Sequence, residues 1–154
     1  MKERARVSAE ANKDVVRRLI EEVWNDHDLT NIDEVVAGDH FEHMAVPEHR
    51  HGIESARHVM SWLFAVFPNH RFDIEDAVAD GDRVAVRGTC GGTHEGELWG
   101  IPPTGKRFAV QQVHWFRVAD GKVAEHWAVR DDLGMMRQLG VVPTQRHSEE
   151  ANST

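Results

Sequence analysis

Tyrosine is absent from the 154-residue sequence, and cysteine occurs once, at Cys90. Without tyrosine, every mechanism that requires a phenol is excluded. A single cysteine cannot form an internal disulfide, which favours a reducing compartment. Apolar runs of the roughly 20 residues needed to cross a bilayer are also missing, and the first residues lack the apolar stretch of a signal peptide. Together these absences predict a cytoplasmic location.

Basic residues are scarce relative to acidic ones. The 18 Lys and Arg against 26 Asp and Glu give a net charge of −8 with histidine neutral. Such a surface repels phosphate groups, so nucleic acids and anionic membranes are unfavourable partners. Hydrophobic residues make up 40% of the chain, which at this length is enough for one domain with a substantial core.

Polar residues without apolar periodicity occupy both ends of the chain, at 1–11 and 144–154. We predict that these two ends are flexible. Residues 12–143 contain no linker and no internal repeat, so they are predicted to form a single domain.

Three helices are predicted in the first half of this domain. Asn12 can cap the first, whose apolar residues recur at helical spacing between 15 and 24. A short second helix is expected to begin at Thr30 or Asn31 and to end at Gly38. A histidine-rich stretch, DHFEHMAVPEHRHG, separates it from a third helix at 53–67.

Alternating patterns replace the helical ones in the second half. Strands are predicted at 72–77, 84–90, 108–118 and 122–130. Two Asp-Gly turns are the strongest hairpin signals, and a bulge or bend is expected at Gly91 and Gly92. Asp131 can cap a short C-terminal helix. Helices followed by strands indicate an α+β fold, with the helices packed on one face of an antiparallel sheet.

The sequence resembles the SnoaL-like polyketide cyclases, also called ester cyclases, in three stretches: LWGIPPTGKRF at 98–108, QQVHWFRVADGKVAEHW at 111–127 and DDLGMMRQLGVVP at 131–143. This family belongs to the nuclear transport factor 2-like superfamily. The resemblance implies a cone-shaped α+β barrel whose curved antiparallel sheet and helices form a deep apolar pocket, usually in a homodimer. It also implies an intramolecular aldol ring closure of a polyketide-like, small hydrophobic metabolite, without metal or cofactor.

The same resemblance implies a general acid/base aspartate on the last long strand, two residues after a histidine. The corresponding residues here are His126, Trp127 and Ala128, and alanine cannot move a proton. Two interpretations follow: an acid/base enzyme that uses another side chain, or a non-catalytic protein that binds a small molecule in the same pocket. In both, His126 and Ala128 are predicted to line the pocket, with Val123 and Trp127 on the other face of the strand.

On the strand at 108–118, alternation places Gln112 and His114 on the same face as apolar residues. This face is predicted to look into the pocket, where the resemblance implies that both side chains hold substrate oxygens. An imidazole exchanges protons near neutral pH, so His114 is the first catalytic candidate; the alternative is a hydrogen-bonded core histidine. Asp131 is a second catalytic candidate, against the simpler role of a helix cap.

Further substrate contacts are predicted nearer the N-terminus. The resemblance places the histidine-rich stretch at the mouth of the pocket, with His43 facing inside. Apolar walls are expected from Met44, Trp62 and Phe64, for which core packing is the alternative explanation. Cys90 is interpreted as a small buried hydrophobe rather than a nucleophile.

Four histidines, His40, His43, His49 and His51, lie close together in the sequence. Imidazoles at such spacing can bind zinc, but neither cysteine partners nor an H-E-x-x-H helix accompany them. We therefore predict no metal site and no cofactor.

An apolar patch is expected on the face of the sheet opposite the pocket. Trp115, Trp127 and Val129 alternate with the pocket residues of their strands, so they should lie together on that outer face. Such a patch suits a homodimer interface.

Overall fold

The computed structural model describes residues 1–142, apart from the side chains of residues 5–7, so the predicted tail at 144–154 lies outside the described residues. The long helices are α1 (Lys2–Arg18), which continues into the π-helical segment η1 (Leu19–Asn25), and α2 (Ile53–Val66). The strands are β1 (Val36–Glu42), β2 (Arg71–Asp80), β3 (Arg83–Thr93), β4 (Arg107–Ala119) and β5 (Lys122–Arg130). The short helices are η2 (Ile32–Glu34), η3 (Pro47–His49) and α3 (Asp132–Gln138). Within residues 1–142, no helix is both long and apolar enough to cross a membrane.

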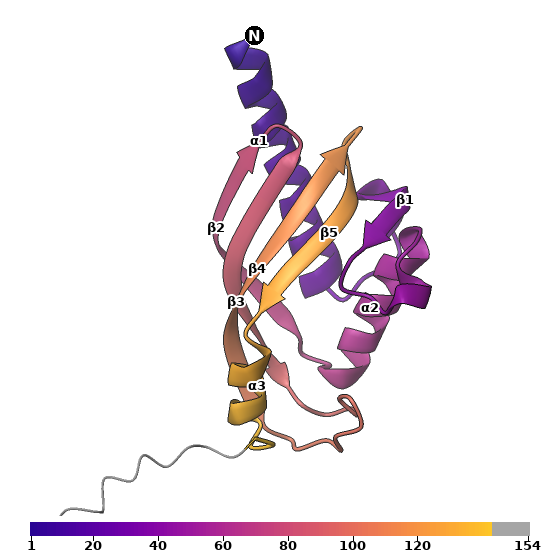
Figure 1. Ribbon diagram of the computed structural model, residues 1–154, viewed down its shortest axis with the longest axis vertical. Helices are drawn as coiled ribbons and strands as arrows, with labels where there is room; N and C mark the ends of the chain where they lie inside the picture. Colours follow the sequence, from indigo (N-terminus) through magenta and orange to yellow (C-terminus); the bar gives the residue numbers. More distant parts are fainter. Residues whose placement is uncertain (143–154) are drawn as a thin grey trace, which may run out of the picture.

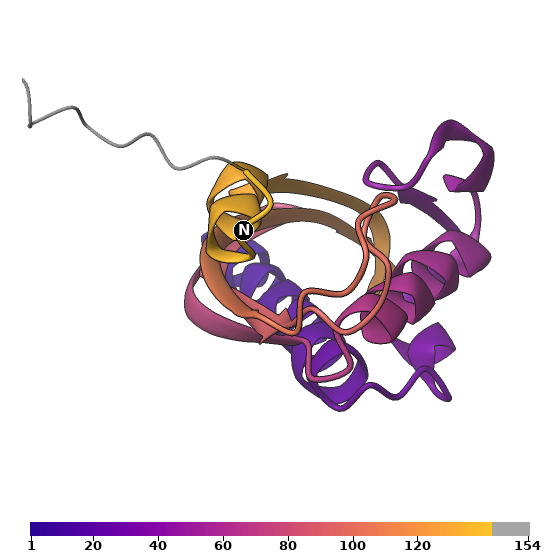
Figure 2. The ribbon, with the colours of Figure 1, turned by 90° about the horizontal axis from the view of Figure 1, so that it is seen from below.

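The five strands form one curved sheet in the order β1-β5-β4-β3-β2 (Figure 1). Strands β2 to β5 are antiparallel, whereas β1 pairs in parallel with β5. Figure 2 shows the sheet curving around, with α1 and α2 on its concave side. The predicted α+β fold with helices on one face is therefore confirmed, but the sheet is mixed rather than purely antiparallel.

Helix α1 starts earlier than the sequence suggested. It begins at Lys2 and not at Asn12, so residues 2–11 are helical where a flexible end was predicted. This segment is rich in lysine, arginine, glutamate and alanine, whose high helix propensity requires no apolar stripe. Asn12 instead donates from its side-chain amide to the Gly81 carbonyl oxygen, 3.1 Å away in the β2–β3 turn.

Strand β1 replaces the last three residues of the short helix predicted up to Gly38. One 3-10 turn forms in η2, after which the chain is extended. The β-branched Val35 and Val36 and the glycine disfavour a continued helix. Because β1 runs parallel to β5, Glu42 lies opposite His126 in the ladder.

A change of register in the β4–β5 ladder alters one predicted face. Arg117 pairs with Glu125 and Val118 with Val123, which leaves Ala124 without a partner. Both Val123 and Ala124 are buried. The prediction that Val123 faces outward is therefore wrong, because the extra residue of a bulge resets the alternation.

A bulge or bend was predicted at Gly91 and Gly92, and the regular pairing there contradicts the bulge. Both glycines pair regularly with β4, and the irregularity lies in β2, between Ile74 and Asp76. A Cβ atom at Gly92 would lie 3.1 Å from the Cβ of Phe67. The missing side chain at Gly92 therefore leaves space for Phe67, the residue that ends α2.

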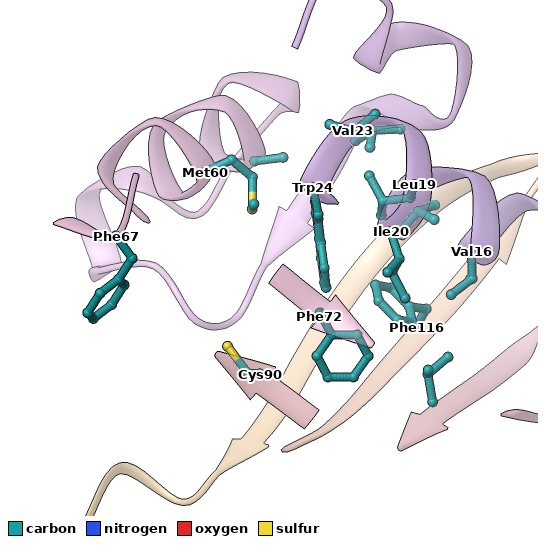
Figure 3. Packing of buried hydrophobic residues seen from close by; sticks show 14 of the residues in the cluster. Val16, Leu19, Ile20, Val23, Trp24, Met60, Phe67, Phe72, Cys90 and Phe116 are labelled. Atoms are coloured by element: carbon teal, nitrogen blue, oxygen red, sulfur yellow. The ribbon is translucent and has the colours of Figure 1, made fainter. Parts of the chain in front are cut away.

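Segment η1 anchors the helices to the concave face of the sheet. Its buried Leu19, Ile20 and Trp24 pack toward Phe72 and Phe116 of the sheet (Figure 3). The rings of Trp24 and Phe72 meet edge to face, with centroids 6.3 Å apart. The core thus holds the indole of Trp24 between the helices and the middle of the sheet.

Candidate functional site

A cavity lies between the concave face of the sheet, η1 and α2. Its walls are mainly aromatic and aliphatic, with Trp24, Leu63, Phe67 and Phe72 among them. Six of the residues predicted to contact substrate or to act on it line the cavity: Met44, Trp62, Gln112, His114, His126 and Ala128. A few polar groups within apolar walls are the usual composition of a small-molecule site.

Two indole rings form part of the cavity wall near the solvent. Trp99 is 54% exposed, and its ring lies nearly parallel to that of Trp62, with centroids 6.3 Å apart. Trp99 and Gly100 have φ angles of 48° and 82°, in the left-handed region, and form the tight turn between Leu98 and Ile101. The turn at the start of the LWGIPPTGKRF stretch therefore contributes an aromatic side chain to the rim.

His43 does not face the cavity, so that expectation is wrong. Its Nε2 lies 2.9 Å from an oxygen of Glu125, and its ring stacks on Trp127 with centroids 4.4 Å apart. Both partners lie on the outer face of the sheet, the face away from the cavity. Strand β1 ends with Glu42 directed inward, so the next residue is directed outward.

Phe64 and Asp131 also lie away from the cavity. The ring of Phe64 stacks on His27, with centroids 4.1 Å apart, on the side of α2 turned toward the loop after η1. Asp131 caps α3, where its carboxylate accepts a hydrogen bond from the backbone N–H of Gly134 at 2.8 Å. The helix-cap interpretation of Asp131 is confirmed by this geometry.

A chain of hydrogen bonds crosses the polar part of the cavity wall. Nδ1 of His126 lies 2.8 and 2.9 Å from the two carboxylate oxygens of Glu42. Nε2 of His126 lies 2.8 Å from Nδ1 of His114, and Nε2 of His114 lies 2.9 Å from Oε1 of Gln112. The chain thus links a carboxylate on β1 to two imidazoles and an amide on β5 and β4.

Glu42 is buried, and the surrounding groups keep it ionised. Burial raises its pKa, but the charge of His126 and the hydrogen bonds from His126, His40 and the Met44 backbone N–H lower it by more. The pKa of Glu42 therefore lies well below its usual value. A carboxylate that accepts several hydrogen bonds is stable in this setting even without water.

The environment of His114 favours a neutral imidazole. Burial, followed by the charges of His126 and Arg130, lowers its pKa well below the usual value. Trp24 and Phe72 contact the ring edge to face, with centroids 5.0 and 4.8 Å away. At neutral pH, His114 therefore keeps one ring nitrogen free of a proton.

Two arrangements of protons satisfy every hydrogen bond of this chain. In the first, neutral His126 donates to Glu42 and accepts from His114 Nδ1, and His114 Nε2 accepts from the amide nitrogen of Gln112 after that amide turns over, because Oε1 faces Nε2 in the structure. In the second, His126 is an imidazolium that donates at both nitrogens, while His114 donates from Nε2 to Gln112 Oε1. The second contains one more proton and fits the Gln112 orientation in the structure, so the chain can take up a proton if the Gln112 amide turns over.

Ala128 stands opposite His114 in the β4–β5 ladder. Its backbone N–H contacts the sulfur of Met44 at 3.1 Å, and its methyl group leaves this part of the cavity apolar. The carboxylate of the site comes from Glu42 on another strand. Sequence analysis missed Glu42 because no strand was predicted in the histidine-rich stretch; an alternating pattern at 40–42 was the available signal.

A second polar pair lies deeper in the cavity wall. Nε2 of His70 is 3.3 Å from the sulfur of Cys90, and Nδ1 of His70 is buried without a partner among the described residues. Burial and the nearby charge of His27 lower the pKa of His70 to about 4. Burial raises the pKa of Cys90 to about 12, which fits a buried thiol rather than a nucleophile.

The four clustered histidines do not converge. His40 contacts the Val123 carbonyl oxygen and Glu42, His43 lies on the outer face, and His49 lies against His58. Within residues 1–142, no three His, Cys, Asp or Glu side chains are arranged to hold a metal ion.

A curved sheet closed by helices over an apolar cavity is the architecture of an α+β barrel, and apolar cavities with a few polar groups are typical of small-molecule sites. Comparison with known families is more specific. Residues 14–139 match the SnoaL-like polyketide cyclases, and the chain belongs to this family.

Individual relatives agree with this assignment. The chain is 34% identical over 134 residues to the aklanonic acid methyl ester cyclase DnrD of Streptomyces peucetius, covering 82% of this chain and 89% of that protein. It is 31% identical over 118 residues to the nogalonic acid methyl ester cyclase of Streptomyces nogalater, covering 71% and 84%. Among solved structures, TsrD from Streptomyces laurentii superposes with a TM-score of 0.78 at 27% identity, covering 86% and 97%. The resemblance predicted from sequence is confirmed.

Proposed function

We propose that this protein is a cofactor-free cyclase of a polyketide-type ester, with His114 as the general base. The observation that carries the proposal is the His114 imidazole, which lines an apolar cavity and is neutral at physiological pH. The relatives named as methyl ester cyclases support the substrate class. The single cysteine supports a reducing, cytoplasmic setting.

The proposed step is an aldol closure without net oxidation or reduction. Nε2 of His114 removes a proton from a carbon beside a carbonyl group, and the resulting enolate carbon attacks a second carbonyl carbon of the same molecule. One carbon–carbon bond forms, and the attacked carbonyl becomes an alkoxide that takes the proton back from His114. Gln112, beside His114, can donate its amide N–H to the enolate oxygen.

The apolar walls suit a ring-bearing ester. Met44 and Trp62 supply flat or adaptable apolar surface, and Ala128 leaves room opposite the base. Water excluded from such walls cannot compete for the enolate, which favours ring closure over proton return from solvent.

The test uses aklanonic acid methyl ester and follows ring closure by chromatography and mass spectrometry. We choose His114→Asn, because the amide replaces Nδ1 toward His126 but removes Nε2. A general base typically contributes at least about 100-fold, so His114→Asn should lower kcat by that factor. The matched control is His43→Asn on the outer face, which should retain wild-type turnover. Equal turnover by His114→Asn and the wild type would refute the proposal.

A second candidate function is a non-catalytic binding protein, favoured by the methyl group of Ala128 where the family acid is expected. In that case the ester binds but is recovered chemically unaltered. Incubation with stoichiometric protein, followed by chromatography, separates the two functions: an enzyme returns the ring-closed isomer, and a binding protein returns the unclosed ester.

A further inference from the structure

The position of the buried carboxylate differs from what the family resemblance implies. The resemblance places an acid at residue 128, opposite His114, whereas this chain has alanine there. Among the acidic residues in 1–142, Glu42 alone is buried. Asp132 also lines the cavity, but its carboxylate is 42% exposed and pairs with Arg130 at 3.2 Å. Glu42 is therefore the carboxylate that contacts His126 directly and, through His126, is linked to His114.

We infer that Glu42, acting through His126, supplies the negative charge that an acid at position 128 would supply, and so allows His114 to work as a base. This inference rests on the function proposed above. Glu42 and His126 are positioning residues here, because each acts through the next imidazole and neither has to touch the reacting atoms.

The proton count of this relay is balanced. When His114 Nε2 takes the substrate proton, its Nδ1 proton passes to Nε2 of His126. His126 then becomes an imidazolium that faces the Glu42 carboxylate. Between Glu42, His126 and His114 these two states match the two arrangements described above, and the substrate carbon takes the place of Gln112 at Nε2 before the transfer. Return of the proton to the alkoxide reverses both transfers.

The geometry of the two rings suits this transfer. The nitrogens that share the proton are 2.8 Å apart, while the ring centroids are 5.1 Å apart and the planes differ by 13°. The rings therefore lie end to end in nearly one plane, with the proton path between them. Trp24 and Phe116 hold the His126 ring, with centroids 5.7 and 4.9 Å away.

Several charged or titratable groups surround the relay. Glu42 and His40 face it from β1, Arg130 from β5, and His70 from the turn before β2. Burial, His126, Arg130 and His70 lower the pKa of His114, and Glu42 raises it. Loss of the Glu42 charge therefore makes His114 a weaker base.

The test compares Glu42→Gln with Glu125→Gln. Each variant replaces a carboxylate that contacts a histidine by an amide of similar shape, but only Glu42 faces the cavity. Turnover of aklanonic acid methyl ester is measured between about pH 5 and 8, where histidine titrates. The histidine nitrogens of the ligand-free proteins are followed by 15N NMR over the same range.

Glu42→Gln should lower kcat at least about tenfold with KM changed less than about twofold, because the charge acts on the transition state. The acidic limb of its kcat/KM profile should move to lower pH, and the nitrogen signals of His114 and His126 should shift. Glu125→Gln should leave all of these unchanged. Identical behaviour of the two variants would overturn the inference.

A measurement on the unaltered protein guards against a variant that does not fold. One shared proton links the two imidazoles, so the nitrogen signals of His114 and His126 should change together in a single titration. Independent titration of the two rings would overturn the inference.

The two hypotheses fail in different ways. If His114→Asn retains wild-type turnover while Glu42→Gln shifts the NMR signals, the proposed function is wrong, and with it the role given to Glu42. If His114→Asn is inactive while Glu42→Gln is fully active, the proposed function stands and the inference about Glu42 is wrong.

Discussion

A short histidine–glutamate hydrogen bond lies on each face of the sheet, and the two are almost equally long. His126 and Glu42 on the cavity side are 2.8 Å apart, and His43 and Glu125 on the outer face are 2.9 Å apart. Their exposures differ: 8% and 5% for the inner side chains against 31% and 23% for the outer ones. The two pairs thus have nearly equal distances but are shielded from water to different degrees. Burial therefore decides how much each pair contributes to stability.

Partners outside the pair reinforce this difference. Glu125 also contacts Arg117 at 2.7 Å, and its pKa is lowered by the hydrogen bond from His43 and by this arginine. Exposed ion pairs of this kind contribute about 0–1 kcal/mol. The inner pair has no such access to water, so the loss of one partner leaves the other uncompensated.

The largest expected effect is on stability. Removal of one partner of a buried ion pair costs about 3–5 kcal/mol, so His126→Phe should lower the free energy of unfolding by that amount at neutral pH. His43→Phe on the outer face should lower it by less than about 1 kcal/mol. Urea denaturation of both variants measures the difference. Equal losses would show that the two pairs are energetically alike.

Acid should destabilise the protein through its inner histidines. The pKa of His70 is about 4 in the folded protein against 6.5 as the ordinary value, so the unfolded chain binds the proton more readily. The stability linked to His70 is present above pH 6.5 and is lost as the pH falls toward 4, by about 3 kcal/mol in total.

Chemical denaturation at a series of pH values checks this dependence. His70→Phe should flatten the fall in unfolding free energy between these two pH values, whereas His43→Phe on the outer face should leave it in place. A slope that persists in His70→Phe would assign the acid sensitivity to other groups.

Restoring at position 128 the aspartate that the family resemblance implies should lower the free energy of unfolding. Ala128→Asp places a carboxylate among apolar side chains, so we expect the protein to fold but to lose about 1–3 kcal/mol at neutral pH. The deficit should shrink in acid, where the new carboxyl is protonated. Ala109→Asp, at an exposed position of β4, is the matched control. An unchanged melting temperature for Ala128→Asp would mean that the position is solvated.

Substitutions on the outer face should have the smallest effect on stability. They should instead change the association of two copies of the chain. Val113, Trp115 and Val129 are 39%, 47% and 76% exposed, and Trp115 stands opposite Trp127 in the ladder. We predict that this patch forms a homodimer interface, which Trp115→Glu should disrupt. Sedimentation velocity measures the change. Val78→Glu, at an exposed site on β2, should leave the dimer intact, and a wild-type monomer would contradict the prediction.

Local patterns were sufficient to predict the centre of the sheet from the sequence. The alternation on β4 correctly placed Gln112 and His114 toward the cavity, and the Asp-Gly turns marked both hairpins. These features are predictable because they depend on neighbours a few residues apart. Helix α2 was predictable for the same reason.

Long-range pairing was the part that local patterns could not supply. The segment around Glu42 contains no turn signal that reveals its parallel pairing with β5, and without a strand there the inward position was given to His43. A shift of one residue along a strand moves a side chain to the opposite face. The bulge at Ala124 caused a similar error for Val123, because a bulge depends on the partner strand.

The edge position of β1 has a consequence for refolding. Glu42 and His126 are 84 residues apart in the sequence, whereas β2 to β5 are joined by successive hairpins. Contacts between distant segments form late in folding. During recovery from denaturant, the circular dichroism of strands β2 to β5 should therefore return before the proposed turnover does, because that turnover requires β1 to be docked on β5.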